Sequence, residues 1–315
     1  MQIQTKLAHL AAVVRRLPLP VVATRSLRRI GIESAWTRYI DFLHSPDTRR
    51  LTKAVEILFR MMGQASLPLE PIAVALPGGT LLEIGCGRHI GFAPFAVSLG
   101  ARQYIGVDPA LDPALLQRAA VIEKYLAPAC DAALVLADQL PAFKPLVTGY
   151  GDPRRAERVL AQSHLVCDGV GALAIAPRSV DVCVSISCLE HIADFSHAAE
   201  IIAEVSHPDT VHVHLVNFSN HLSKAEPFRD LYDRPYAEFA QRWNQSVNGL
   251  RVSDMLQCFA GAGLTLDSVI VDTRPEALPR YIDPYWATRD SPEELAIKTA
   301  LLTNLVPKLL AGSPR

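Results

Sequence analysis

The sequence predicts a doubly wound α/β fold with a mostly parallel sheet that begins near Thr80. Three observations support this prediction. Short apolar runs alternate with segments of helical periodicity, as expected for strands joined by helical crossovers. The first run, residues 80–85, ends in glycine, and the second, residues 103–108, ends in an acid. Ligands of such sheets bind outside the carboxyl ends of the strands, so these two endings mark a candidate site.

The other elements follow from the same periodicities. Further strands are expected over residues 164–168, 180–187, 210–218 and 264–272. Helices are expected over residues 34–43, 52–62, 91–101, 194–206 and 251–264. We therefore divide the chain into a helical N-terminal preface, residues 1–70, and a sheet domain, residues 71–315. Residues 110–163 and 219–250 are too long for simple connections and are interpreted as insertions, the first with extra helices and the second placed to cover a substrate.

Composition narrows the class of protein. Half of the 315 residues are apolar and 20% are charged, which is ordinary for a soluble domain with a large core. The net charge of -1 gives no electrostatic reason to expect a nucleic-acid partner. No apolar run reaches the ~18 residues that a membrane-spanning helix needs. The six cysteines form no C-x-x-C pair, which favours neither a zinc site nor a disulfide framework and is typical of a reducing cytoplasm.

The first 32 residues are basic and contain no acid before Glu33. This pattern fits a transit peptide, a basic helix on an anionic membrane or a partner, or an ordinary helical cap with a solvated basic face. Pro18 and Pro20 interrupt any long helix there because they lack amide donors. The three interpretations stay open at this point. The basic residues are Lys6, Arg15, Arg16, Arg25, Arg28 and Arg29.

The segment that follows the first strand is a candidate cofactor loop. Gly85 and Gly87 stand between a strand and a helix, where glycine allows positive φ and a close approach of the backbone to a ligand. Asp108 ends the next strand about 20 residues later, the position from which a carboxylate accepts hydrogen bonds from ribose hydroxyls. Asp168 ends the third strand and is suited to the amino group of adenine. Each acid alone is also compatible with an ordinary turn.

These features, together with the segment DVCVSISCLEHI at residues 181–192, resemble class I S-adenosylmethionine-dependent methyltransferases. The resemblance covers about residues 80–272 and extends to type 11-like enzymes of bacterial glycan and natural-product genes. It implies a Rossmann-like methyltransferase fold for the sheet domain and S-adenosylmethionine as cofactor. It also implies cofactor contacts from Glu83, Gly85, Cys86, Gly87, Asp108, Asp168, Gly169, Ser185 and Ser187.

The sequence departs from the pattern of that family at several positions. His89 replaces the usual third glycine and puts a side chain where the cofactor tail passes. The family's D-x-x-D-H motif appears with amides, as Asn217 and Asn220 before His221, so we predict no bound metal. A later W…N-R-L-R segment implies acceptor contacts, although Gly249 stands where an arginine is expected. The residues retained from that segment are Trp243, Asn248 and Arg251.

Methyl transfer needs an aligned acceptor and, for a hydroxyl, a base. His191 and His221 follow the fourth and fifth strands and are the candidate catalytic bases, although either one is also compatible with an ordinary loop histidine. His212 and His214 share one face of a strand and are expected to pack, because no cysteine or carboxylate joins them at ligand spacing along the chain.

The predicted function is thus O-methylation of a small-molecule or sugar hydroxyl, and the acceptor and the oligomeric state stay open. An amine acceptor and a non-catalytic methyltransferase-like regulatory partner are the alternatives. A nicotinamide dehydrogenase is disfavoured because Ile90 occupies the third glycine position of its fingerprint, and the chain has no G-x-S-x-G hydrolase motif. Aromatic and arginine side chains in residues 219–250 fit either acceptor contacts or an inward-packed lid.

Overall fold

The computed structural model describes residues 35–44, 51–152, 154–221, 223, 225–243 and 247–306. Its centre is a seven-stranded sheet with the strand order β3-β2-β1-β4-β5-β7-β6. The basic segment, residues 1–32, lies outside the described residues. The strands are β1 (Thr80–Ile84), β2 (Gln103–Val107), β3 (Ser163–Val166), β4 (Val180–Ile186), β5 (Ser206–Asn217), β6 (Asp267–Thr273) and β7 (Ile297–Thr303).

The sheet confirms the doubly wound α/β prediction and adds one strand to it. Strands β1 to β5 pair in parallel, and β7 pairs antiparallel with both β5 and β6. The sequence analysis expected six strands and missed β7, because Lys298 and Thr299 interrupt its apolar run and leave no strand-like alternation. The carboxyl ends of β1, β2, β4 and β5 meet at one edge of the sheet, where the glycine loop and the candidate acids lie.

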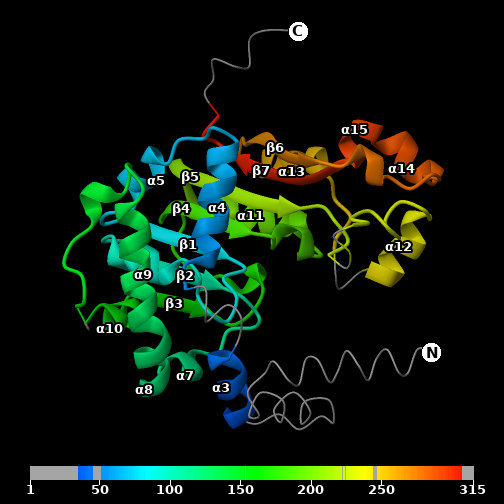
Figure 1. Cartoon of the computed structure of the whole chain (residues 1–315). Coiled ribbons are helices and arrows are strands. Elements are labelled where there is room, and N and C mark those ends of the chain that lie inside the picture. The colour runs from blue at the N-terminus through cyan, green and yellow to red at the C-terminus, as the bar shows by residue number, and fades with distance from the viewer. Residues whose placement is uncertain are drawn as a thin grey trace.

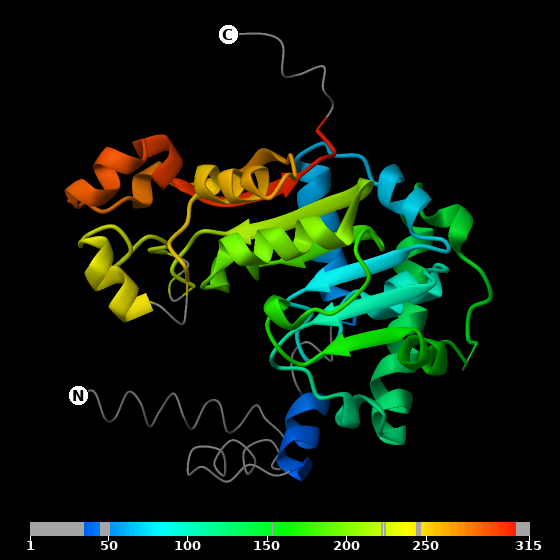
Figure 2. The same cartoon turned by 180° about the vertical axis from the view of Figure 1, so that it is seen from behind.

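Two apolar cores cover the two faces of the sheet. One face packs against α4, α6, α9 and α10, and Figure 1 shows α4 and α9 in front of the strands. The other face packs against α11 and α13, which Figure 2 shows from behind. These helices are α4 (Lys53–Gln64), α6 (Ala93–Ser98), α9 (Ala127–Asp138), α10 (Arg154–Ala161), α11 (Phe195–Val205) and α13 (Val252–Gly261).

Shorter elements complete the chain. The first insertion contains helices, as expected, and its longest is α9. The remaining α-helices are α3 (Ala35–Leu43), α5 (Glu70–Ala75), α7 (Pro113–Leu116), α8 (Ala119–Val121), α12 (Tyr236–Trp243), α14 (Pro284–Arg289) and α15 (Pro292–Leu295). A π-helical turn covers Ile122–Leu126, and single 3-10 turns cover Lys144–Leu146, Val170–Ala172, Leu189–His191 and Pro275–Ala277. In the described part of the chain, no helix has both the length and the apolar character of a bilayer span.

The two predicted helices of the preface that fall in the described residues are present and pack on the sheet domain. Helix α4 buries one side at helical spacing, because its apolar residues recur every three or four positions. Phe59 of α4 stacks on Phe143 and contacts the edges of Phe92 and Phe95. Helix α4 therefore shares the core of the sheet domain and lies over the edge where the glycine loop begins.

The described part of residues 219–250 forms a small lid with its own core. Phe228, Tyr232 and Phe239 are almost fully buried, and they pack against Trp286 of α14. Helices α12, α14 and α15 lie together at one side of the sheet (Figure 1). These three aromatic residues are therefore packed inward, whereas Tyr236 is exposed.

Candidate active site

The glycine loop leaves β1 in a conformation that requires glycine. Gly85 has a φ of 77° and Gly87 a φ of 61°, which are strained for any other residue. A Cβ atom on Gly85 would collide with the side chain of Cys188. The amide of Gly85 donates to the carbonyl of Val107 at 2.8 Å, so the loop is fastened to the end of β2. A glycine at position 85 is thus required both by its φ and by the close approach of Cys188.

Asp108 links the end of β2 to the same loop. Its Oδ2 accepts a hydrogen bond from the amide of Gly87 at 2.8 Å, and its Oδ1 accepts one from the amide of Ala110 at 2.7 Å. Each carboxylate oxygen has two lone pairs, so both oxygens retain a lone pair for a further donor. Asp108 therefore lies where a ribose diol can reach it.

Glu83 is a buried acid beneath the loop. Its Oε2 accepts hydrogen bonds from the amide of Phe92 at 2.9 Å and from the hydroxyl of Tyr104 at 2.6 Å. Burial raises the pKa of Glu83 from 4.5 to about 7, although both hydrogen bonds act in the opposite direction. A cationic ligand group beside this carboxyl would favour its ionised form.

Two cavities meet at Gly85. The nucleoside-side cavity has a volume of about 300 Å³ and is lined by Asp108, Asp168, Gly169 and His191. The loop-side cavity has a volume of about 370 Å³ and lies between α4 and the glycine loop. Its lining includes Glu83, Cys86, Gly87 and Ser187 from the sheet domain, and Leu51, Lys53, Ala54 and Ile57 from the preface.

Two histidines and one acid gather after β4 and β5. The ring centroids of His191 and His221 lie 4.8 Å apart. Nε2 of His221 lies 3.4 Å from Oε1 of Glu190 and 3.1 Å from the carbonyl oxygen of Asn217. Glu190 is only 2% exposed, and its Oε2 has no hydrogen-bond partner among the described residues. The hydrogen bond to Glu190 raises the pKa of His221 above its ordinary value of 6.5.

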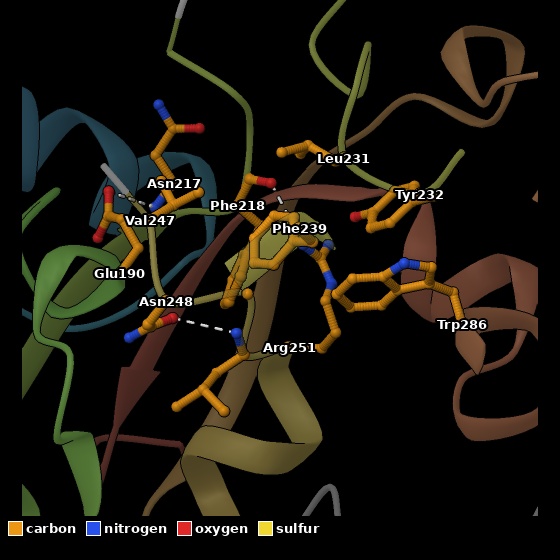
Figure 3. Close-up of a pocket in the computed structure, with 12 residues that line it drawn as sticks. Glu190, Asn217, Phe218, Leu231, Tyr232, Phe239, Val247, Asn248, Arg251 and Trp286 are labelled. Carbon is orange, nitrogen blue, oxygen red and sulfur yellow. Dashed lines mark hydrogen bonds between the residues drawn. The ribbon is translucent and has the colours of Figure 1, made fainter. Parts of the chain in front are cut away.

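Backbone and amide hydrogen bonds hold Glu190 in place. The side-chain amide of Asn248 donates to the carbonyls of Leu189 and Ile192, and its backbone amide donates to the carbonyl of Glu190 at 2.7 Å. The backbone amide of Asn217 donates to Oε1 of Glu190 at 3.2 Å. Figure 3 shows Glu190, Asn217 and Asn248 on one side of a small cavity of about 20 Å³, with Arg251 and the lid aromatics on the other.

The sequence analysis missed Glu190, although it lies between Leu189 and His191 in the quoted segment. The position of Glu190 next to His191 in the sequence does not indicate that Glu190 also contacts His221, which lies 30 positions after His191. The contact between Glu190 and His221 arises because β4 and β5 are neighbours in the sheet. The contact could have been predicted from the positions of Glu190 and His221, because each follows directly after one of two adjacent parallel strands.

Comparison with known families decides the assignment. Residues 57–269 match a family model described as a methyltransferase domain. The chain belongs to this family of methyltransferases. A search of curated proteins finds no match. The family match and the cavities on either side of Gly85 make the protein an S-adenosylmethionine-dependent methyltransferase.

Among solved structures, the methyltransferase is similar to an S-adenosylmethionine-dependent methyltransferase from Mesorhizobium loti. The two share 16% identity and a TM-score of 0.39, over 76% of this chain and 93% of that one. It is also similar to a geranyl diphosphate methyltransferase in complex with its cofactor. That pair shares 13% identity and a TM-score of 0.42, over 87% and 92% of the two chains. The assignment rests on the family match and not on these likenesses.

The described residues of the methyltransferase fit the cofactor. Asp108 and Asp168 line one cavity and would hold the nucleoside, with Asp168 exposed beside the amide of Gly169. The loop-side cavity also reaches Gly85 and would take the methionine part. Glu83 lies in that second cavity and would face its ammonium group. These assignments remain predictions for binding measurements.

The structure separates the two serines of the methyltransferase that were predicted near the sulfonium. Ser187 lines the loop-side cavity and has a φ of 47°. Ser185 is fully buried and its hydroxyl contacts Nδ1 of His214 at 3.0 Å. Ser185 shares a face of β4 with Cys183, the face covered by α11 and α13, whereas Ser187 lies beyond the end of the strand. The expected cofactor contact of Ser185 is therefore corrected to a contact in the core.

His89 packs differently from the expectation that its side chain crosses the cofactor path. Its ring stacks on Phe42 of α3 at 4.3 Å and meets the edge of Tyr125. Next to it, Arg88 forms an ion pair with Asp41 of α3 at 2.7 Å. The side chain that replaces the third glycine thus fastens the cofactor loop to α3, and His89 also contributes to the wall of the loop-side cavity.

Two of the residues predicted to contact the acceptor, Asn248 and Arg251, make contacts within the methyltransferase itself. Arg251 is 2% exposed, donates to the carbonyls of Phe218 and Ile297, and stacks over Phe218 and Tyr232. Such a guanidinium holds β5, β7 and α13 together and offers little surface to an acceptor. The side-chain amide of Asn248 donates to the carbonyls of Leu189 and Ile192, as described above. Trp243 ends α12, and its side chain lies outside the described part of the structure.

The amides of the altered motif also have structural contacts. The side-chain amide of Asn220 donates to the carbonyls of Glu226 and Arg229, and its Oδ1 accepts from the amide of Ser223. An aspartate could not donate these two hydrogen bonds. Asn220 therefore shapes the loop that carries His221.

Proposed function

We propose that the enzyme methylates a hydroxyl group of a small-molecule or sugar acceptor. The observation that carries this proposal is the contact between His221 and the buried carboxylate of Glu190, beside His191 at the wall of the nucleoside-side cavity. A hydroxyl must lose its proton as it is methylated, and imidazole is the side chain suited to that task near neutral pH.

The hydrogen bonds of His221 determine which nitrogen acts as the base. Nε2 faces two acceptors, Oε1 of Glu190 and the carbonyl of Asn217, so Nε2 carries the proton of the neutral ring. The lone pair is then on Nδ1, which would accept the proton of the acceptor hydroxyl. The negative charge of Glu190 stabilises the imidazolium that forms. S-adenosylmethionine, when bound, supplies the electrophilic methyl group.

The test compares single variants at saturating cofactor. His221→Asn should lower turnover by ~10²–10⁴-fold, the usual contribution of a general base, and leave cofactor affinity nearly unchanged. The wild-type rate should fall as the pH is lowered through the pKa of His221, which lies above 6.5. Glu190→Gln should lower turnover and move this fall to lower pH, since the main cause of the raised pKa is removed. His197→Asn, on the exposed side of α11, is the control.

Three other outcomes would change the assignment. Loss of turnover in His191→Asn alone would move the base to His191. Full turnover in both histidine variants would favour an amine acceptor, which needs no protein base. The ligand atoms of Glu190, His191 and His221 lie within 4.8 Å of one another and could hold a cation. We expect activity to survive excess EDTA; a loss restored by Mg²⁺ or Mn²⁺ would show that a metal ion, not a histidine, activates the acceptor.

A further inference from the structure

A second group of metal-ligating side chains lies inside the sheet, away from the cofactor edge. Cys183 of β4 is directly opposite His212 of β5 in the parallel register, and His214 is the next residue on the same face of β5. All three residues have 0% exposure. Candidate ligand atoms of the three lie within 4.8 Å of one another. Cys183 is far from the two histidines in the sequence, but it lies beside them in the fold because β4 and β5 are neighbours.

Hydrogen bonds do not satisfy this group. Nδ1 of His214 lies 3.0 Å from the hydroxyl of Ser185, and Nε2 of His214 lies 3.4 Å from Nδ1 of His212. The chain of contacts ends there, because Nε2 of His212 is buried and has no partner among the described residues. The two nitrogens that face each other, and that a shared ion would join, are Nδ1 of His212 and Nε2 of His214. The methyl transfer proposed above uses none of these side chains.

We propose that Cys183, His212 and His214 bind one soft, thiophilic metal cation, and that Cu⁺ is the ion that suits them best. Thiolate and imidazole are the ligands that select such ions. Two nitrogens bound at ~2.0–2.1 Å to one metal lie ~3.3–3.6 Å apart in tetrahedral or trigonal geometry. The separation of 3.4 Å between the two facing ring nitrogens falls in this range, whereas it is long for a hydrogen bond. Ser185 would then orient His214 from behind.

Charge balance in the core favours the monovalent ion. Binding releases one proton from the thiol of Cys183, and the resulting thiolate and Cu⁺ together carry no net charge. Zn²⁺ with the same ligands would leave one positive charge among the apolar side chains of α11 and α13, which is costly without a counter-ion.

An open groove lies next to this group, at the amino end of the strands. It has a volume of about 900 Å³, and its lining includes His207, Thr210 and Asn304. Thr210 lies two residues before His212 and points to the same face of β5. Oδ1 of Asn304 accepts from the backbone amide of His212 at 3.0 Å. The three ligands are fully buried and do not line this groove, so a cation reaches them only when this end of the sheet, opposite the cofactor, opens.

The test uses the full chain, stripped of metal and kept anaerobic with its thiols reduced. Cu⁺ is titrated against a chromophoric Cu⁺ chelator, and X-ray absorption then identifies the donor atoms around the bound copper. We expect one copper per chain with one sulfur and two nitrogen donors. Cys183→Ser should weaken binding by at least tenfold and remove the sulfur donor. Cys258→Ser, on a half-buried thiol of α13, should change neither.

Because the donor atoms are read in the wild-type protein, the test does not depend on a core variant that folds. A parallel titration with Zn²⁺ distinguishes the ions: a tighter zinc complex with the same donors would support the site and assign it to the divalent ion. Copper bound through nitrogen and oxygen alone would place the ion at Glu190, His191 and His221 and overturn the proposal. Absence of binding by either ion would also overturn it.

Discussion

Glu83 shows how one buried carboxyl makes the stability of the protein depend on pH. Its pKa is raised to about 7 by burial, against 4.5 for an exposed glutamic acid. The folded state therefore holds this proton more tightly than the unfolded state does. The stabilisation is complete below about pH 4.5 and is lost as the pH rises through 7.

Glu83→Gln should remove this dependence in the cofactor-free protein. The pKa difference of about 2.5 corresponds to about 3 kcal/mol. When the pH is raised from 5 to 8, the unfolding free energy of wild type should therefore fall by up to about 3 kcal/mol more than that of the variant. Urea unfolding at both pH values measures it, with the exposed Glu123→Gln as control. An equal fall in unfolding free energy between the two pH values in all three proteins would show that ionisation of Glu83 does not destabilise the fold.

The residues of the candidate site differ in how far the sequence predicts them. The positions of Gly85 and Asp108 at the cavity walls could be predicted, because a residue that ends a parallel strand is recognised from its local position. The contact of Ser185 could not, because its partner His214 lies on the neighbouring strand β5. Glu190 was missed because its contact with His221 depends on which strands are neighbours.

At the scale of elements, the segment before α13 holds the turn that carries Glu190. Asn248 clasps the turn that carries Glu190, and Gly249 follows with a φ of 76°. A Cβ atom on Gly249 would lie 2.6 Å from the ring of Phe239 in α12. The glycine that replaces the expected arginine is therefore required by the packing of the lid.

Gly249→Ala should lower both stability and turnover. The left-handed conformation costs an alanine ~1–2 kcal/mol, and the displaced Phe239 adds to this. Gly261→Ala is the matched control, because no atom lies within 4 Å of its Cβ position at the end of α13. Thermal unfolding and steady-state kinetics of both variants check the prediction. Equal melting temperatures for the two variants would contradict it.

The elements of the sheet were predictable where the periodicity is strong, and less so at its far edge. Strands β1 and β4 are largely buried, and most of their residues are apolar. Strand β7 is also largely buried, but it is antiparallel, and Lys298 and Thr299 in its first half are only partly buried. The attachment of α3 through Phe42 and His89 could not be predicted, because contacts between distant segments leave no periodic signal.

At the scale of the whole molecule, cofactor binding should stabilise the fold. A ligand that binds only the native state adds ~2.7 kcal/mol at one hundred times its dissociation constant. S-adenosylhomocysteine should therefore raise the melting temperature of the wild-type protein. Asp108→Ala should weaken its binding by ~1–3 kcal/mol, the usual effect of leaving buried hydroxyl groups without a partner. Calorimetry measures the affinity, with Asp138→Ala at the exposed end of α9 as control. Unchanged affinity would remove Asp108 from the site.

The position of β7 has a consequence for how the chain folds during synthesis. β7 is the last of the described strands along the chain, yet it lies between β5 and β6 and pairs with both. Until it is made, the backbone of β5 from Val213 to Asn217 has an unpaired edge and β6 has no neighbour in the sheet. Strand edges of this kind attract other chains. A nascent or truncated chain that ends before Ile297 should therefore depend on chaperones to stay free of aggregates.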